Sequence, residues 1–466
     1  RISQFLLPSH LLRLCGVIIL IRDVTMQQYA LAPLLTERDP VDSAEGGINP
    51  LGTEALADAL AVLLVPGVRE RQRHPRFLTA MAVSLDICRD FDEETLAHDG
   101  VSAPWQVFEW YLVEGLVRSA EEGERVGLPG SLKAARAIAD GVPLSAKRYL
   151  KTPDVFGFHG VYRQLARALG VEDSGRLGET GFDLLNVWAR EQQLEGFAGS
   201  ESGPGKVARV KLKDAVQAGL EKGATARGKD WAGWDFFRKH LAPSPYTAVP
   251  KEAKSIYTAL VNDRKGFRRE VIECLISPKG CQAWEETDSE REFHQALRTT
   301  ASQELRQLLD AIDAYEGFSR LCHDAFQDCL YEMTRQGGKK TSLAVLAALP
   351  SVKCAGQRVP ARFGEVMERL ELVGEAVRFS KVFAGLAERG DKGEWVERLI
   401  EHHRKTQRQK PPNGKNPWFE QFDDGSLIIR PDYRIDAPGT GDARYVHPYR
   451  TRSLYQFSLD LYLIKP

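Results

Sequence analysis

The chain has 466 residues, of which 43% are hydrophobic and 27% are charged, so its apolar content suffices for buried cores and its length suits about three domains. The formal net charge of −1 excludes a uniformly basic nucleic-acid-binding protein and leaves only local clusters of Lys and Arg as candidate polyanion sites. The seven cysteines follow no close-set disulfide pattern, which favours a reducing compartment, and we predict a cytoplasmic protein.

The N-terminal stretch, residues 1–25, contains the apolar run LCGVIILI, which is shorter than the ~20 residues that a membrane span needs. Arg13 and Arg22 flank this run and no small-residue cleavage site follows it, which argues against a signal peptide. Met26 is the first methionine of the chain. We therefore expect residues 1–25 to be a non-native or upstream leader, and we expect no membrane association.

Helical periodicity dominates the rest of the chain. A leucine stripe runs from Leu56 to Leu64, with Thr53 expected to cap the helix and Pro66 to end it. The best strand-like run is SLIIRPDYRI, near the C-terminus. Further helices are predicted over 103–122, 289–333, 362–388 and 393–408. The predicted fold is mainly α, a multi-domain helical protein with a small winged-helix-like α+β module.

Four stretches rich in Gly and Pro interrupt the helical patterns, at 197–206, 242–250, 410–417 and 436–448. After the leader they suggest an N-terminal helical domain (26–140), a winged-helix-like module (141–198), a helical middle domain (199–405) and a C-terminal α+β segment (406–466).

The winged-helix prediction rests on residues 156–191. A helix with an apolar stripe ends at Leu169 and Gly170, EDSG predicts a turn between two short strands, and Thr180 is expected to cap a second helix. Helix, hairpin and helix in this order resemble the winged-helix pattern over about 45 residues.

In winged-helix proteins the helix before the wing commonly enters the major groove. For this chain the resemblance implies groove contacts by Arg163 and Arg167, with Lys147, Arg148 and Lys151 placed upstream to meet phosphates. The alternative is a module of the same fold that serves packing or protein contact.

A second basic cluster lies in PGVRERQRHPRF, just after the first predicted helix. It contains Arg69, Arg71, Arg73 and Arg76, and Glu70 is its only acid. Arginine forks match phosphate geometry, but arginines after a helix end also satisfy its carbonyl groups and dipole. Both interpretations stay open.

A third cluster leads into aromatic residues, as is typical of proteins that bind single strands or flipped bases. The alternative is a solvated helix end whose tryptophan anchors the loop to the core. The candidate contacts are Arg404, Lys405, Arg408, Lys410, Lys415 and Trp418, and a further basic run lies at 206–213.

The chain shows no catalytic motif that assigns a reaction. Cysteine pairs in CLISPKGC and CHDAFQDC are spaced too widely for a short zinc motif, and buried helix cysteines explain them better. GSESGPGKV places Val207 where a phosphate loop needs Ser or Thr. Acids for a metal-dependent nuclease are limited to Asp423, Asp424, Asp432 and Asp436, for which hairpin turns are the favoured explanation. No Ser-His-Asp arrangement can be assigned from sequence order.

Three stretches together, GINPLGTEALADALAVLLVPGVRERQRHPRFLTAMA, HRKTQRQKPPNGKNPWFE and YRTRSLYQFSLDL, resemble mostly helical bacterial proteins encoded in anti-phage defence islands. The resemblance implies a context and no reaction. We predict a non-enzymatic DNA-binding or scaffolding subunit of a multi-protein bacterial antiviral defence system, with DNA and other subunits as partners and with no cofactor or metal. The alternatives are a metal-dependent nuclease component that uses Asp423, Asp424 and Asp432, and a protein-protein adaptor that does not bind DNA.

Overall fold

The computed structural model is mainly helical, as predicted. It contains 19 α-helices and two two-stranded antiparallel sheets in the residues that it describes. Within this part of the chain no helix combines the length and apolar character that crossing a bilayer requires. The predicted leader lies outside the described residues, which are 49–119, 125–199, 202–243, 250–263, 266–388, 394–411, 413–441 and 443–464.

Contacts divide the chain into two compact units. Among the described residues, the smaller unit consists of residues 49–52, Ser319–Phe363 and Val382–Gly441, and the larger unit of Thr53–Phe318, Gly364–Lys381 and residues 443–464. This division differs from the linear one expected from the Gly- and Pro-rich breaks, because each unit is assembled from segments far apart in the chain. Three helices continue from one unit into the other, α15 (Gln303–Arg335), α17 (Pro350–Glu371) and α18 (Ala376–Ala387).

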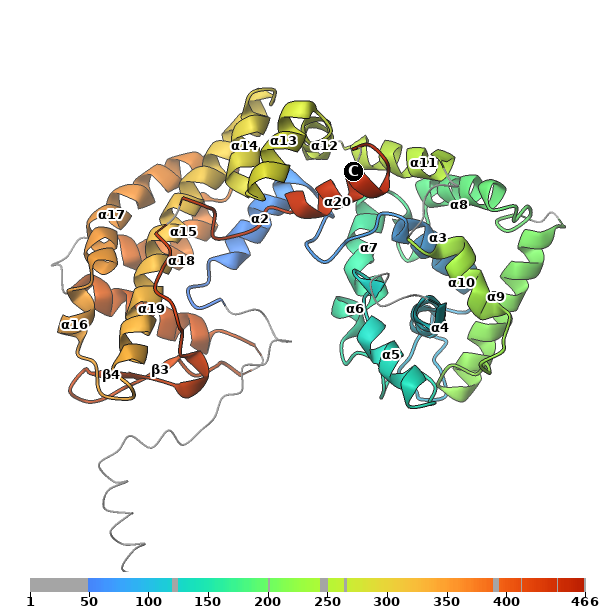
Figure 1. Ribbon diagram of the computed structural model, residues 1–466, viewed down its shortest axis with the longest axis horizontal. Coiled ribbons are helices and arrows are strands. Elements are labelled where there is room, and N and C mark those ends of the chain that lie inside the picture. Colours follow the sequence, from blue (N-terminus) through green and yellow to red (C-terminus); the bar gives the residue numbers. More distant parts are fainter. Residues whose placement is uncertain are drawn as a thin grey trace, which may run out of the picture. The chain divides into compact units, whose positions relative to one another are not determined.

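The larger unit is built around helix α4 (Pro104–Ser119). Every residue from 107 to 117 is buried, so this helix is enclosed on all sides, as its apolar sequence requires. Figure 1 shows α4 end-on among its neighbours. It packs against α3 (Phe77–Cys88), α5 (Ser131–Ala139), α7 (Phe158–Ala168), α9 (Pro204–Lys222) and α10 (Gly233–Leu241).

Two glutamates, Glu109 and Glu114, lie within the buried part of α4. A buried carboxylate is costly unless hydrogen bonds or an opposite charge compensate it. Glu114 accepts from the Arg118 guanidinium at 2.7 Å, one turn along the helix. Glu109 has no arginine, and its partners form part of the candidate site.

The predicted leucine stripe is confirmed, since Leu56, Leu60 and Leu64 are buried on α2 (Glu54–Leu64). The expected capping role of Thr53 is wrong, because its hydroxyl lies 2.9 Å from His447 Nε2 and does not bond the helix end. The other helices of this unit are α6 (Pro153–Phe156), α8 (Glu179–Glu191), α11 (Pro250–Val261), α12 (Arg268–Leu275), α13 (Pro278–Thr287), α14 (Glu290–Arg298) and α20 (Thr451–Asp460).

The predicted hairpin after α7 is present. Strands β1 (Glu172–Asp173) and β2 (Arg176–Leu177) pair antiparallel. Ser174 and Gly175 connect them with φ values of 52° and 83°, the two positive values that a tight hairpin turn requires. The strands are only two residues long, so the hairpin stays close to the helix that it follows.

The helix ends around the hairpin agree with the sequence in one case and differ in the other. Gly170 follows α7 with φ 73°, the left-handed conformation expected of a glycine there. Helix α8 begins at Glu179 with Gly178 as its N-cap residue. Thr180 therefore lies inside the helix, and its predicted capping role is wrong.

The smaller unit contains α16 (Leu343–Ala347), α19 (Glu394–Arg408) and a second hairpin. Strands β3 (Phe419–Gln421) and β4 (Leu427–Ile429) pair antiparallel, with Phe419 opposite Ile429. All three residues of β4 are buried, which confirms a strand in the first part of SLIIRPDYRI. A 3-10 turn, Pro431–Tyr433, replaces the strand in the remainder.

The described cysteines form no disulfides. Cys322 and Cys329 are both 0% exposed on α15. Their spacing of two helical turns therefore places them in the core, and burial raises the pKa of both thiols.

Candidate functional site

The loop of residues 66–76, here called the basic loop, is fixed against α7. The Gln72 side chain is 0% exposed, and its Nε2 donates to Val161 O at 2.9 Å and to Gly67 O at 3.1 Å. The Tyr162 hydroxyl accepts from two successive backbone N–H groups of the loop at 3.1 and 3.2 Å. The loop therefore presents its outer side chains from a rigid backbone.

Two arginines of the basic loop lie against α7 and the preceding helix. Arg69 Nε donates to Gln164 Oε1 at 2.9 Å, and the exposed Arg71 guanidinium lies 4.5 Å from the centre of the Phe156 ring. Burial lowers the pKa of Arg69, and the nearby Arg450 charge lowers it further. Asp58, which pairs with Arg450, and Glu70 in the loop itself offset part of this positive charge.

Arg76 corrects part of the prediction for the basic loop. It is 3% exposed, its guanidinium pairs with Glu252 at 3.3 Å, and it donates to the carbonyl oxygens of Ala242 at 2.7 Å and His240 at 3.2 Å. A side chain held in this way is not available to a phosphate, so Arg76 serves the fold.

The arginines of α7 share one carboxylate. Arg163 Nε and Arg167 Nε donate to Glu172 Oε1 at 2.9 and 3.0 Å. The two arginine side chains are 42% and 52% exposed, whereas that of Glu172 is 1% exposed. One buried negative charge between two cations leaves a net positive charge at the surface. Seven of the 11 residues of α7 are buried, so only a narrow edge of the helix is exposed. The winged-helix assignment is not confirmed.

A third basic stretch lies between α5 and α6. Lys147, Arg148 and Lys151 are exposed, and none of the ion pairs formed by the described residues involves them. Buried Tyr149 anchors this stretch, because its hydroxyl donates to Glu109 at 2.7 Å.

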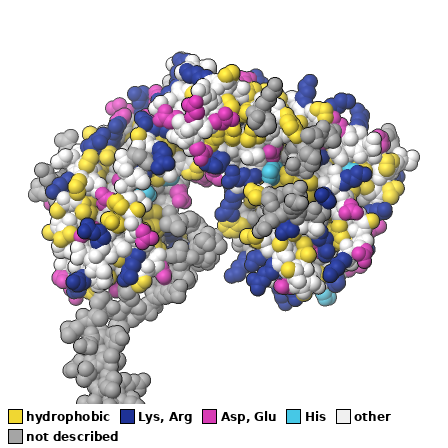
Figure 2. Space-filling model, viewed as in Figure 1, with side chains coloured by type: hydrophobic (Ala, Val, Ile, Leu, Met, Phe, Trp, Pro, Cys, Tyr) yellow, Lys and Arg dark blue, Asp and Glu magenta, His cyan; other side chains and the backbone are white. Residues whose placement is uncertain are grey.

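The basic loop contacts α6 and α7, because Arg71 covers Phe156 and Arg69 binds Gln164. Residues 147–151 lie just before α6, and Tyr149 in this stretch and Phe158 at the start of α7 both bond the Glu109 carboxylate. Figure 2 shows Lys and Arg side chains gathered over the part that carries α5, α6 and α7. We call this region the basic surface. It consists of Arg69, Arg71, Arg73, Lys147, Arg148, Lys151, Arg163 and Arg167.

The cluster predicted in the smaller unit is partly neutralised. Arg404 and Arg408 both approach the Glu401 carboxylate, at 3.1 and 3.6 Å. Trp418 is 8% exposed and stacks on Tyr433 with ring centres 4.8 Å apart. The tryptophan is therefore a core residue, which corrects the expectation that it offers an open face to a base. Lys405 is exposed, and Lys410 and Lys415 are half-buried.

The basic run at 206–213 is also partly engaged within the fold. Arg209 Nε bonds Asp86 at 2.6 Å, and Arg209 and Lys213 each bond Asp90 at 3.1 Å. These contacts tie α9 to the end of α3. Fewer basic side chains of this run are therefore available to bind an anion than the sequence indicates.

The acids considered for a nuclease lie at the second hairpin. Asp423 and Asp432 are exposed, and Asp424 accepts from Ser426 and pairs with Lys340 at 3.3 Å. The hydrogen bond from Ser426 lowers the pKa of Asp424. Within the described part of the chain, no three His, Cys, Asp or Glu side chains gather closely enough to hold a metal ion.

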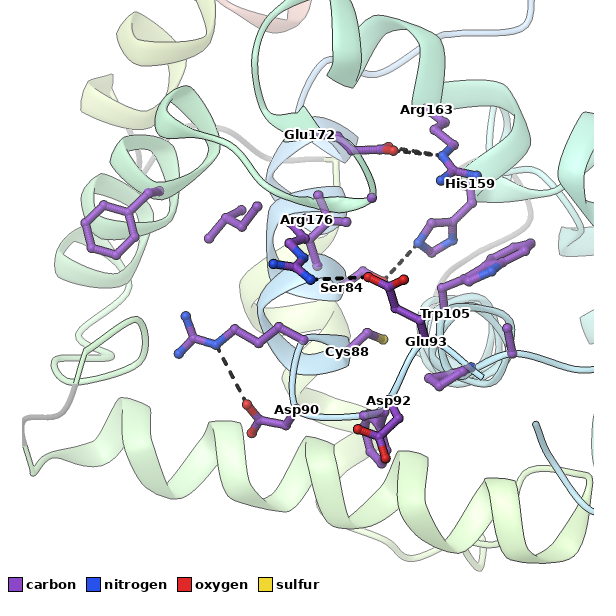
Figure 3. Close-up of a pocket in the computed structure, with 18 residues that line it drawn as sticks. Ser84, Cys88, Asp90, Asp92, Glu93, Trp105, His159, Arg163, Glu172 and Arg176 are labelled. Atoms are coloured by element: carbon purple, nitrogen blue, oxygen red, sulfur yellow. Dashed lines mark hydrogen bonds and ion pairs between the residues drawn. The ribbon is translucent and has the colours of Figure 1, made fainter. Parts of the chain in front are cut away.

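A cavity of about 810 Å³ opens in the larger unit, within the roughly 300–1,000 Å³ typical of small-molecule sites. Figure 3 shows its walls, which come from α3 and the loop after it, the start of α4, α7 and the first hairpin. Ser84, His159 and Trp105 line it together with Arg163. The cavity therefore adjoins the helix that also supports the basic loop.

A hydrogen-bonded relay of three side chains reaches this cavity. Ser84 Oγ lies 2.9 Å from His159 Nε2, and His159 Nδ1 lies 3.0 Å from Glu109 Oε2. Because a carboxylate can only accept, Nδ1 donates to Glu109, and in a neutral imidazole this tautomer leaves Nε2 to accept from the Ser84 hydroxyl. Glu109 also accepts from the backbone N–H groups of Phe158 and His159 and from the Tyr149 hydroxyl.

The surroundings of the relay are aromatic and carry charges of both signs. The Trp105 ring lies 5.0 Å from the His159 ring. Burial raises the pKa of the neighbouring Cys88 thiol to about 12, so this sulfur is protonated at neutral pH and a poor nucleophile. At the rim, Arg176 pairs with Glu93 at 3.3 Å.

Sequence reasoning missed the relay, because its members come from three helices and share no local motif. One indication was available in the sequence. Glu109 interrupts the otherwise apolar run VFEWYLV, and a carboxylate in the middle of a buried helix must find donors from other elements.

No known protein family, no curated protein and no solved structure matches the chain.

Proposed function

We propose that the chain binds DNA through the basic surface of its larger unit. The observation that carries this proposal is that the basic loop packs on α6 and α7, next to the basic residues at 147–151, and that the two arginines of α7 share the single buried carboxylate of Glu172. A rigid, under-compensated group of arginines and lysines favours phosphates, which bind by charge and by bidentate hydrogen bonds.

The binding we propose is largely independent of base sequence. Base recognition needs side chains that enter a groove, and α7 offers only Arg163 and Arg167 along its outer edge. In the winged-helix form of this proposal, α7 would border the groove and the first hairpin would serve as a short wing. Contact with the phosphate backbone alone requires no such geometry.

In its cellular context the chain would be a DNA-engaging or scaffolding subunit of a bacterial anti-phage system. The resemblance of its three stretches to proteins of defence islands supports this part of the proposal. The basic surface would hold DNA, and other subunits would supply any chemistry on it.

Fluorescence anisotropy with a labelled duplex and a labelled single strand, over a salt series, tests the proposal. Replacing Arg71, Arg148 and Lys151 together by Ala should weaken binding to the duplex. The slope of the logarithm of the binding constant against the logarithm of the salt concentration, here called the salt slope, should fall in magnitude by about 0.9 for each phosphate that the variant no longer neutralises. The matched control replaces three exposed lysines of α9, Lys206, Lys211 and Lys222, by Ala.

The control removes the same charge from another face, so it should leave the slope close to that of the unchanged chain. Equal losses in both variants would mean that only overall charge matters, and no binding at low salt would refute the proposal and favour a protein adaptor. Repeating the assay with Mg²⁺ and then inspecting the DNA for cuts tests the nuclease alternative.

A further inference from the structure

The larger unit contains two relays of the same chemical type. In one, Ser84, His159 and Glu109 are linked at 2.9 and 3.0 Å. In the other, Thr53 Oγ1 lies 2.9 Å from His447 Nε2 and His447 Nδ1 lies 2.7 Å from Glu316 Oε1. Geometry alone therefore does not separate a catalytic arrangement from a buried polar network.

The two relays differ in their position relative to the cavity of about 810 Å³. Ser84 and His159 line the cavity of about 810 Å³, whereas Thr53 and His447 line neither this cavity nor the smaller one of about 250 Å³ beside α9 and α10. Ser84 borders a space large enough for a small substrate and is itself only 1% exposed, whereas Thr53 is 7% exposed.

We propose that this cavity is a hydrolytic site for carboxylic esters with a small apolar or aromatic acyl group, with Ser84 as nucleophile and His159 as general base. Glu109 acts through His159 as a positioning residue, because its carboxylate fixes the ring tautomer that leaves Nε2 free to accept a proton. This inference does not depend on DNA binding.

The reaction requires only the ester and water. Ser84 Oγ attacks the carbonyl carbon while its proton passes to His159 Nε2, and the C–O bond to the leaving alcohol breaks as the alcohol takes that proton. Water then attacks the acyl-serine, giving up a proton to His159, which returns it to Ser84 Oγ as the acid leaves. The net change is ester plus water to acid plus alcohol.

The walls suit this class of substrate. Trp105, Phe91 and Phe182 line the cavity and provide aromatic surface for the acyl group. Arg163 lies one helical turn beyond His159 on the same wall, where its positive charge would favour the oxyanion that forms during the attack. Cys88, whose thiol is protonated at neutral pH, does not compete with the hydroxyl.

A fluorophosphonate probe, which modifies activated serines, tests the assignment on the full chain without any mutation. We expect one adduct, on Ser84, localised by fragmentation of the tryptic peptide 77–89. The same sample should hydrolyse p-nitrophenyl butyrate, and prior labelling should abolish that hydrolysis.

Two variants of the relay and one control separate catalysis from structure. Ser84→Ala should remove both the adduct and the hydrolysis, and His159→Gln should slow labelling by about 100-fold or more. Thr53→Ala, which breaks the relay that lines neither cavity, should leave labelling unchanged, and thermal melting reports whether each variant is folded.

Absence of an adduct on Ser84 in the folded, unmodified chain would overturn the proposal. So would hydrolysis that survives in folded Ser84→Ala. Either result would make the relay a buried polar network like that of Thr53. DNA binding is measured separately and is unaffected by this outcome.

Discussion

Gln72 is the side chain that fastens the basic loop to α7, and replacing it by Met tests this role. Methionine keeps the length of the side chain but removes three hydrogen bonds, from Arg69 N at 3.0 Å, to Gly67 O at 3.1 Å and to Val161 O at 2.9 Å. At a net ~1 kcal/mol for each buried bond, partly offset by the more apolar side chain, the loop should be destabilised by about 2–3 kcal/mol.

Hydrogen exchange read by mass spectrometry over residues 66–76 measures this destabilisation directly, because the loop amides are protected only while the loop is closed. A change of 2–3 kcal/mol corresponds to exchange faster by about 30- to 150-fold. Gln164→Met is the matched control, since its hydrogen bond to Arg69 is exposed, and we expect an increase of less than about threefold there. An equally small increase in Gln72→Met would refute the argument that buried amide bonds hold the loop.

Three further changes have defined outcomes. Burial lowers the pKa of His403 to about 3, so its contribution is complete above the unfolded pKa near 6.5 and is lost as the pH falls. About 2 kcal/mol should be gone by pH 5 and more on further acidification toward pH 3, so the difference in melting temperature between the unchanged chain and His403→Gln should change by that amount between pH 7 and pH 5. Arg76→Ala leaves the Glu252 carboxylate buried without its cation and should cost about 3–5 kcal/mol in denaturant unfolding, less when combined with Glu252→Gln. Trp418→Ala removes a buried ring stacked on Tyr433 and should destabilise the smaller unit by about 3–5 kcal/mol while DNA affinity measured by anisotropy stays unchanged.

Local structure could be predicted where neighbouring residues decide it. The leucines of α2 recur at helical spacing, and Gly170 follows α7 in the left-handed conformation that favours glycine. The two caps assigned to threonine failed for different reasons. The Thr53 hydroxyl bonds His447, which lies near the other end of the chain. Helix α8 begins two residues earlier than predicted, so Gly178 and not Thr180 is its N-cap residue.

The site could be predicted only in pieces, because long-range contacts assemble it. The arginines of the basic loop and of α7 are visible as clusters in the sequence, but nothing local shows that they meet. Gln72 joins them through a buried hydrogen bond and Tyr162 through a partly buried one, and Gly67 allows the close approach, since a Cβ there would lie 2.7 Å from the Ala168 Cβ. None of these three residues is charged, so a search for clusters of charge does not single them out.

Helix α7 explains why two unrelated activities can be proposed for one region. Its buried side carries His159 into the cavity, and its outer edge carries Arg163 and Arg167 to the surface. Arg163 belongs both to the cavity wall and to the basic surface, because it lines the cavity and bonds Glu172 together with Arg167. A substitution at Arg163 therefore cannot separate DNA binding from ester hydrolysis. Substitutions at Arg71 and Ser84 can separate them, because Arg71 belongs only to the basic surface and Ser84 only to the cavity. Loss of DNA binding alone in the first variant and of hydrolysis alone in the second would show that α7 supports two independent sites.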